Sequence, residues 1–126
     1  MNMVNNTPRP LPDAPSDTDG VSPEEELTIV SSAFAALGSE TRLAIVLRLV
    51  RAGHSGIATG ELGEAVGVTG SVLTHHLKHL KAAGLIYQEK DGRRIMWFAD
   101  HDFVGDISHF MVKECCVDDQ WVIKNG

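Results

Sequence analysis

The sequence has few cysteines, few aromatic residues and no long apolar run. Its 126 residues include two cysteines, one tyrosine and two tryptophans. The cysteines, Cys115 and Cys116, are adjacent and close no loop, so a disulfide framework is excluded. No apolar run approaches the roughly 18 residues of a membrane span, and the first residues lack a signal-peptide pattern. We therefore expect a protein without membrane contact in the reducing cytoplasm.

Catalytic motifs are also missing. The two cysteines form no Cys-x-x-Cys motif, and no βαβ pattern is present to hold one. The Asp, Glu and His residues show no recognisable catalytic spacing. We therefore expect a protein that is not an enzyme and needs no organic cofactor, although a measurable reductase turnover would favour thiol chemistry.

Basic residues are fewer than acidic ones, and they are unevenly placed. The chain has a net charge of -6, with 11 Lys and Arg against 17 Asp and Glu. Residues 69–98 hold five basic and two acidic side chains, a local charge of +3 that leaves -9 for the rest. An acidic remainder limits non-specific DNA binding, while a local basic region still allows a specific contact.

The chain length suits one compact domain with tails. Residues 1–21 contain four prolines and few large apolar residues, which is typical of a disordered tail. We place a single domain at residues 22–117 and a C-terminal tail at residues 118–126.

Two amphipathic helices are expected first. Ser22 with the following Pro-Glu-Glu forms a helix start, and this helix ends near Gly38. Ser39 caps a second helix that stops at Gly53 and is apolar on most sides, as a central buried helix would be. The apolar positions of the two helices are Leu27, Val30, Phe34, Leu37, Leu43, Ile45, Val46, Leu47, Leu49 and Val50.

A helix-turn-helix and a hairpin follow. One short helix runs from Thr59 to Gly67, and a second is capped by Thr69 and runs to about Ala83. The inward side chains of the pair are Leu62, Ala65, Val66, Leu73, Leu77 and Leu80. Leu85–Glu89 and Ile95–Phe98 are expected as strands joined at Asp91-Gly92.

The last helix is expected to begin at Asp100 or Asp102 and to run through Cys116. Its apolar side holds Phe103, Ile107, Phe110 and Met111. The order of elements predicts a mainly α fold with a small β-hairpin, a winged helix-turn-helix.

The second helix of such a motif enters the major groove with its first residues. Its outward face here carries hydroxyls, an apolar contact for thymine and one cation: Ser71, Val72, Thr74, His75 and Lys78. Arg93 and Arg94 follow the hairpin tip and can reach a minor groove or the phosphate backbone. His76 lies beside the apolar stripe and is expected to be a partly buried structural histidine.

An alternative is a winged helix that binds only other proteins. Such a module has no need of a basic hairpin tip, and salt-sensitive binding to operator DNA separates the two possibilities.

The same segments resemble a known family. Ala35-Ala36-Leu37-Gly38, Thr41-Arg42-Leu43, the run from Thr74 to Leu80, Ala83-Gly84-Leu85-Ile86 and Gly92-Arg93 are similar to the ArsR/SmtB repressors that respond to metals and metalloids. The resemblance covers about residues 27–116. It implies a homodimer formed through the first and last helices, with operator DNA released when an inducer binds.

The cysteine pair is the candidate inducer site. Thiolates are soft ligands, and a vicinal pair in the last helix resembles the sensor of arsenic- and antimony-responsive family members. The resemblance therefore implies arsenite or antimonite as inducer at Cys115 and Cys116, with the third ligand undetermined. Three alternatives stay open: a redox or persulfide switch, structurally inert thiols, and a zinc or cadmium site.

Overall fold

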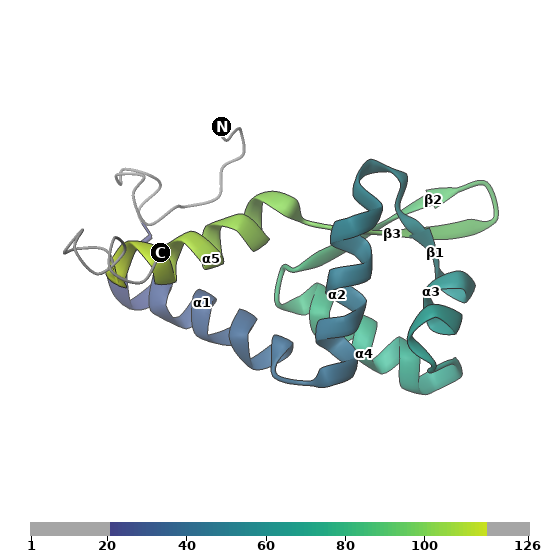
Figure 1. Ribbon diagram of the computed structural model, residues 1–126, viewed down its shortest axis with the longest axis horizontal. Coiled ribbons are helices and arrows are strands. Elements are labelled where there is room, and N and C mark those ends of the chain that lie inside the picture. The colour runs from purple at the N-terminus through teal and green to yellow at the C-terminus, as the bar shows by residue number, and fades with distance from the viewer. Residues whose placement is uncertain (1–20, 116–126) are drawn as a thin grey trace.

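The structure, a computed structural model, describes residues 21–115. Five α-helices, one 3₁₀ turn and three strands follow one another along these residues (Figure 1). In chain order they are α1 (Pro23–Leu37), α2 (Glu40–Ala52), η2 (Gly53–Ser55), β1 (Ile57–Ala58), α3 (Thr59–Val66), α4 (Gly70–Ala82), β2 (Ile86–Asp91), β3 (Arg94–Ala99) and α5 (His101–Cys115). None of these helices combines the length and the apolar character of a membrane-spanning helix.

Three helices begin where the sequence predicts a side-chain cap. Ser22 accepts a hydrogen bond from the backbone N–H of Glu25, and the Glu25 carboxylate accepts one from the N–H of Ser22, which completes a capping box. Ser39 caps α2 through the N–H of Arg42 at 3.3 Å. Asp100 caps α5 through the N–H of Phe103 at 3.0 Å, so Asp100 rather than Asp102 starts the last helix.

The sheet has one strand more than the sequence predicts. The order is β1-β3-β2, all antiparallel, and Ile57 of β1 pairs with Trp97 of β3. Asp91 pairs with Arg94, so the hairpin turn is Gly92-Arg93 and not Asp91-Gly92. Gly92 has a φ of 66°, and a glycine at the first central position is the preference of the tight turn that matches strand twist.

The core forms where α1, α2, α3, α4, the sheet and α5 meet. Ile45, Leu49, Leu62, Leu80 and Leu85 are its largest fully buried side chains. The predicted inward stripe of α4 is confirmed, since Leu73, Leu77 and Leu80 are all buried. Phe103 and Ile107 join the same cluster from α5.

Six of the side chains that the sequence places on the apolar sides of helices lie exposed in the single chain. They are Leu27, Phe34, Leu43, Leu47, Ala65 and Met111. The core side of α1 is made by Val30 and the small residues Ala33 and Ala36, which are all buried. The expectation that α2 is buried on most sides is therefore wrong for Leu43 and Leu47.

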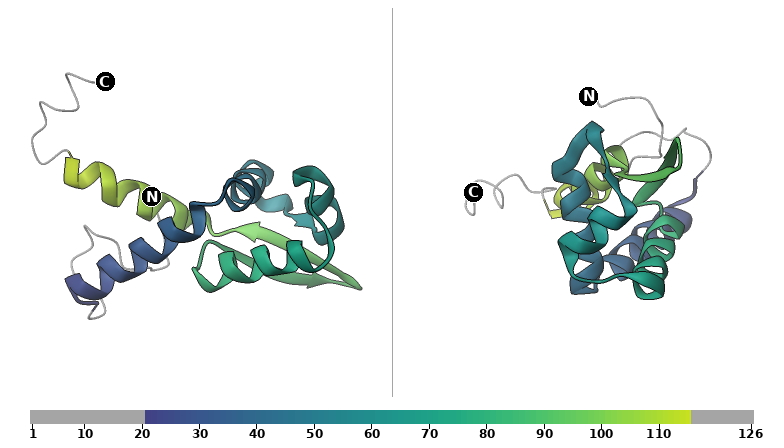
Figure 2. Two further views of the ribbon diagram at one scale, coloured as in Figure 1. Left: turned by 90° about the horizontal axis from the view of Figure 1, so that it is seen from below. Right: turned by 90° about the vertical axis from the view of Figure 1, so that its right-hand side faces the viewer.

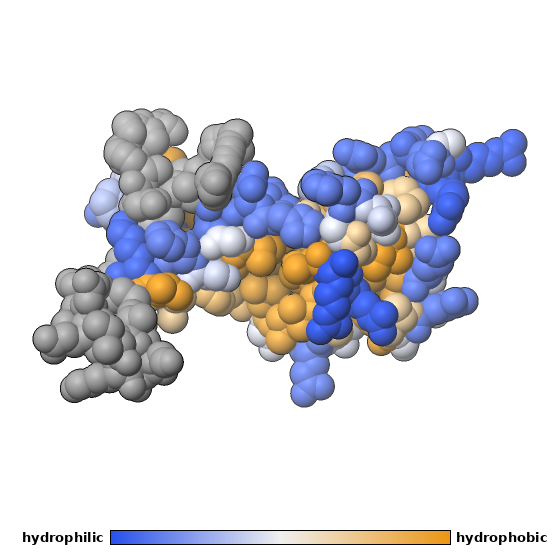
Figure 3. Space-filling view, turned by 45° about the horizontal axis from the view of Figure 1, so that its top comes forward, coloured by the Kyte–Doolittle hydropathy of each residue, from blue (hydrophilic) through white to orange (hydrophobic). Residues whose placement is uncertain are grey.

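The helices are unevenly distributed in space. α1 and α5 extend toward the same end of the molecule, away from the part formed by α2, α3, α4 and the sheet (Figure 1), and the hairpin projects at the opposite end (Figure 2). A broad apolar area lies in the middle of one face, with hydrophilic side chains toward both ends (Figure 3). The molecule thus has a helical end, a hairpin end and an uncovered apolar area.

Gly63 on α3 lies too close to the start of α4 to carry a side chain. A Cβ at this position would lie 2.6 Å from the Val68 carbonyl oxygen and 2.9 Å from Leu73 Cδ2. We predict that Gly63→Ala lowers the free energy of unfolding by about 1–3 kcal/mol, measured by chemical denaturation. Gly60→Ala on the same helix is the matched control, since its Cβ meets nothing within 4 Å and should be neutral or stabilising. Equal stability of both variants would contradict the close approach.

Candidate nucleic-acid interface

The outer face of α4 carries every residue that the sequence predicts for the second helix of the motif. Ser71, Val72, Thr74, His75 and Lys78 are all exposed, with Val72 retaining 54% of its surface. The buried stripe of α4 faces the core, so these side chains are held on the opposite side of a fixed helix. No acidic residue occurs in α4, which leaves this face free of charge that would repel phosphate.

The N-terminus of α4 has unused hydrogen-bonding capacity. Thr69 is the N-cap, but its side chain makes no capping hydrogen bond, and the N-cap of α3 is Ala58. The Thr74 hydroxyl donates to the Gly70 carbonyl at 3.2 Å, so its oxygen can still accept a hydrogen bond. Exposed N–H groups at a helix start, with the positive end of the helix dipole, suit a phosphate oxygen.

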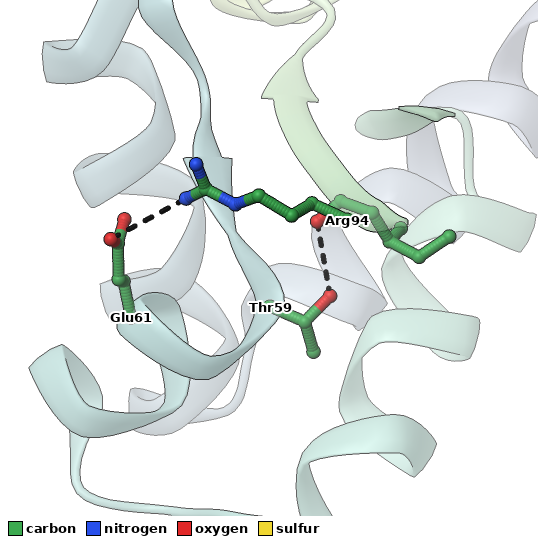
Figure 4. A network of polar contacts seen from close by, with 4 residues as sticks. Thr59, Glu61 and Arg94 are labelled. Carbon is green, nitrogen blue, oxygen red and sulfur yellow. Dashed lines mark hydrogen bonds and ion pairs between the residues drawn. The ribbon is translucent and has the colours of Figure 1, made fainter. Parts of the chain in front are cut away.

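The two hairpin arginines differ in their surroundings. Arg93 lies exposed in the turn, whereas Arg94 Nη2 lies 3.5 Å from Glu61 Oε2 on α3 (Figure 4). Both partners of this ion pair are more than half exposed, so the pair is weak and Arg94 can exchange Glu61 for a phosphate. The contact of Glu61 with Arg94 could not be predicted from the sequence, because the two residues are 33 positions apart and no local pattern links them.

Thr59 joins the helix-turn-helix to the hairpin. Its hydroxyl accepts a hydrogen bond from Trp97 Nε1 at 2.8 Å. The same hydroxyl donates one to the Ile95 carbonyl at 3.3 Å (Figure 4). These bonds fix the first residue of α3 on the middle of β3. The hairpin therefore has a defined position relative to α3 and α4.

His76 is half-buried on the inner side of α4, which confirms the structural role predicted for it. Its Nδ1 lies 3.4 Å from Arg42 Nη1, and Arg42 Nε donates to the Ala36 carbonyl at 2.7 Å. A guanidinium only donates, so His76 Nδ1 is the acceptor and must be unprotonated. Burial, followed by the charges of Arg42, His75 and His79, lowers the pKa of His76.

The predicted thiol site lies at the end of the described residues. Cys115 is the last residue of α5, and Cys116 lies outside the described residues. Within residues 21–115, no group of three or more His, Cys, Asp or Glu side chains is placed to hold a metal ion.

One exposed residue of α4 was not among the predicted site residues. His79 lies one turn after His75, with ring centroids 6.5 Å apart. The spacing of four residues, which places two helical side chains on one face, was the available signal.

The lowered pKa of His76 predicts a pH dependence of stability. Between the lowered folded pKa of His76 and the ordinary value of 6.5, His76 is protonated in the unfolded chain but mostly neutral in the folded chain. The free energy of unfolding therefore rises with pH in this window. The contribution is fully present above pH 6.5 and is lost as the pH falls through the lower folded value. We predict that His76→Gln flattens the fall in unfolding free energy between about pH 7 and 5. His54→Gln controls for removal of an exposed histidine, and an unchanged slope in His76→Gln would contradict the assignment.

Comparisons with known proteins agree with this arrangement. A family model described as a helix-turn-helix domain matches residues 37–89. The HTH-type transcriptional repressor SmtB from two strains of Mycobacterium tuberculosis is 38% identical over 80 residues, which cover 63% of this chain. The chain spans 57% of the length of these curated relatives.

Two solved structures match most of the described fold. An ArsR-like transcriptional regulator from Rhodococcus sp. RHA1 is 25% identical with a TM-score of 0.65, covering 79% of this chain and 91% of that one. NolR from Sinorhizobium fredii is 30% identical with a TM-score of 0.58, covering 73% of this chain and 91% of that one. The chain therefore has the winged helix-turn-helix fold, and its sequence is similar to those of an SmtB repressor and an ArsR-like regulator.

Proposed function

We propose that this protein is a cytoplasmic repressor that binds operator DNA as a homodimer and leaves it when a trivalent metalloid binds Cys115 and Cys116. The outer face of α4 carries the DNA-binding part of the proposal. That face is exposed and has no acidic side chain, and Arg93 lies exposed in the hairpin turn, within the basic region of the sequence. The helix-turn-helix match and the similarity to an SmtB repressor support the same interpretation.

The dimer part of the proposal is supported by apolar side chains that the single chain leaves uncovered. Leu27 and Phe34 on α1 and Met111 and Val112 on α5 are 41–61% exposed. Four such side chains on the two helices that extend from the body favour burial against a second copy. A dimer related by a two-fold axis presents two copies of α4, which suits half-sites about one helical turn apart.

The inducer part of the proposal rests on the chemistry of the cysteine pair. Adjacent side chains on a regular helix point about 100° apart, so two neighbouring thiolates bind one ion only if the helix end distorts. Cys115 ends α5, where Met111 and Val112 are exposed on the preceding turn. Metalloid capture would therefore disturb the proposed dimer face next to it.

The contacts of α5 and α1 supply a route from that face to the DNA-binding helix. His101 Nε2 lies 3.2 Å from the Val50 carbonyl and so connects the start of α5 to α2. Arg42 connects the end of α1 to His76 on α4. A shift of α1 or α5 in the dimer would change how far apart the two α4 helices lie. A coupling of about 1–3 kcal/mol, a 5- to 150-fold loss of DNA affinity, is typical of such a switch.

The hairpin assignment predicts a change in salt dependence. If Arg93 neutralises a phosphate, Arg93→Ala should reduce the slope of log K against log salt by about 0.9 per lost contact. Arg51→Ala, an exposed arginine at the end of α2, is the matched control. Fluorescence anisotropy on DNA from the protein's own promoter, at several salt concentrations, measures both. A slope that Arg93→Ala leaves unchanged would remove the hairpin tip from the interface.

The inducer assignment predicts selective release of DNA. Arsenite and antimonite should each release the wild-type protein from promoter DNA under reducing conditions. The Cys115→Ser, Cys116→Ser variant should bind the DNA and stay bound when arsenite is added. Release of this variant by arsenite would contradict the proposal. Release of the wild type by a persulfide donor alone would replace the metalloid by a sulfur or redox signal at the same cysteines.

A further inference from the structure

His79 on α4 has no assigned DNA contact and lies one turn after His75. His75 and His79 are both exposed, lie one turn apart, and have ring centroids 6.5 Å apart at an interplanar angle of 67°. We propose that His75 and His79 form a two-imidazole site for a divalent transition ion on the outer face of α4. The DNA-facing consequence of this site rests on the proposed function, whereas the binding of the ion does not.

The spacing of the pair suits chelation. Side chains four residues apart on a helix have Cβ atoms about 5–6 Å apart, so both imidazoles can reach one ion. Metal–nitrogen bonds of about 2.0–2.1 Å place two such nitrogens roughly 3 Å apart. The rings must therefore close by a rotation about their own bonds, which exposed side chains can make at low cost.

The third histidine of α4 does not take part. His76 faces inward, where its Nδ1 is occupied by the Arg42 guanidinium at 3.4 Å. No third protein ligand converges on the pair within the described residues, so water completes the coordination. Imidazole without carboxylate or thiolate favours Ni²⁺, Cu²⁺ and Zn²⁺ over Mg²⁺ and Ca²⁺.

An ion bound to the pair would compete with DNA for the outer face of α4. His75 belongs to the surface proposed to enter the major groove, so a hydrated ion on it occupies the space of a base edge. Ion and DNA would then exclude each other at the same helix, independently of Cys115 and Cys116. At ten times its own Kd the ion should raise the apparent Kd for DNA about tenfold.

The direct test is calorimetric titration of Ni²⁺ alone into the full-length Cys115→Ser, Cys116→Ser protein, which removes the competing thiolates. We expect one Ni²⁺ per chain, and at least tenfold weaker binding in the same protein with either His75→Gln or His79→Gln. His54→Gln is the matched control, an exposed histidine outside α4 that should leave the affinity unchanged. Wild-type affinity in His79→Gln, or loss of binding in His54→Gln, would overturn the site.

Anisotropy on promoter DNA with the same proteins separates the two proposals. Loss of DNA affinity with Ni²⁺, abolished by His79→Gln, supports both. Calorimetric binding of Ni²⁺ at the pair with unchanged DNA affinity keeps the metal site and contradicts the assignment of α4 as the DNA-facing helix.

Discussion

The arrangement of the helices depends on one half-buried guanidinium. Arg42 donates from Nε to the Ala36 carbonyl near the end of α1 and contacts His76 Nδ1 on α4. A cation removed from water is tolerated only when its donors are satisfied, so these acceptors must stay where they are. The single side chain thereby links the helix proposed for the dimer interface to the helix proposed to read DNA. A neutral His76 is a condition of this link, since a protonated ring would offer Arg42 a second positive charge.

The helices fall into two groups according to whether a side chain caps their first N–H groups. α1, α2 and α5 are each started by a side chain that accepts a backbone N–H, from Ser22, Ser39 and Asp100. α3 and α4 begin without such a side-chain bond. The first N–H groups of α4 are thus not bonded by a capping side chain, which suits the phosphate contact proposed there. Thr59 and Trp97 then keep the hairpin at a fixed distance from α3 and α4.

Much of the fold was predictable because its signals are local. The caps at Ser22 and Ser39, the stripe of Leu73, Leu77 and Leu80, and the change of period at the hairpin each appear within a few residues. The short strand Ile57–Ala58 was missed because two residues carry no period, and its pairing with β3 is a long-range event. The turn was misplaced by one residue because cross-strand register is decided by the whole hairpin.

Burial was predicted less well than secondary structure. The pattern of α1 and α2 marks Phe34, Leu43 and Leu47 as apolar, but it does not say whether a core or a second molecule covers them. The candidate site was likewise predicted only where the signal is local. The exposed face of α4 could be predicted from helical spacing, while the Arg94–Glu61 pair and the Arg42–His76 contact join residues more than 30 positions apart. Contacts of that kind have no signature in a single sequence.

The central claim is that α4 and the hairpin tip form the surface that meets DNA. The most direct measurement is amide chemical-shift mapping of the ¹⁵N-labelled protein titrated with DNA from its own promoter. The account predicts that the largest changes fall on residues 69–78 and on the turn at Gly92-Arg93, with the outer face of α1 little affected. Changes concentrated on α1 and α5, with α4 unaffected, would contradict it.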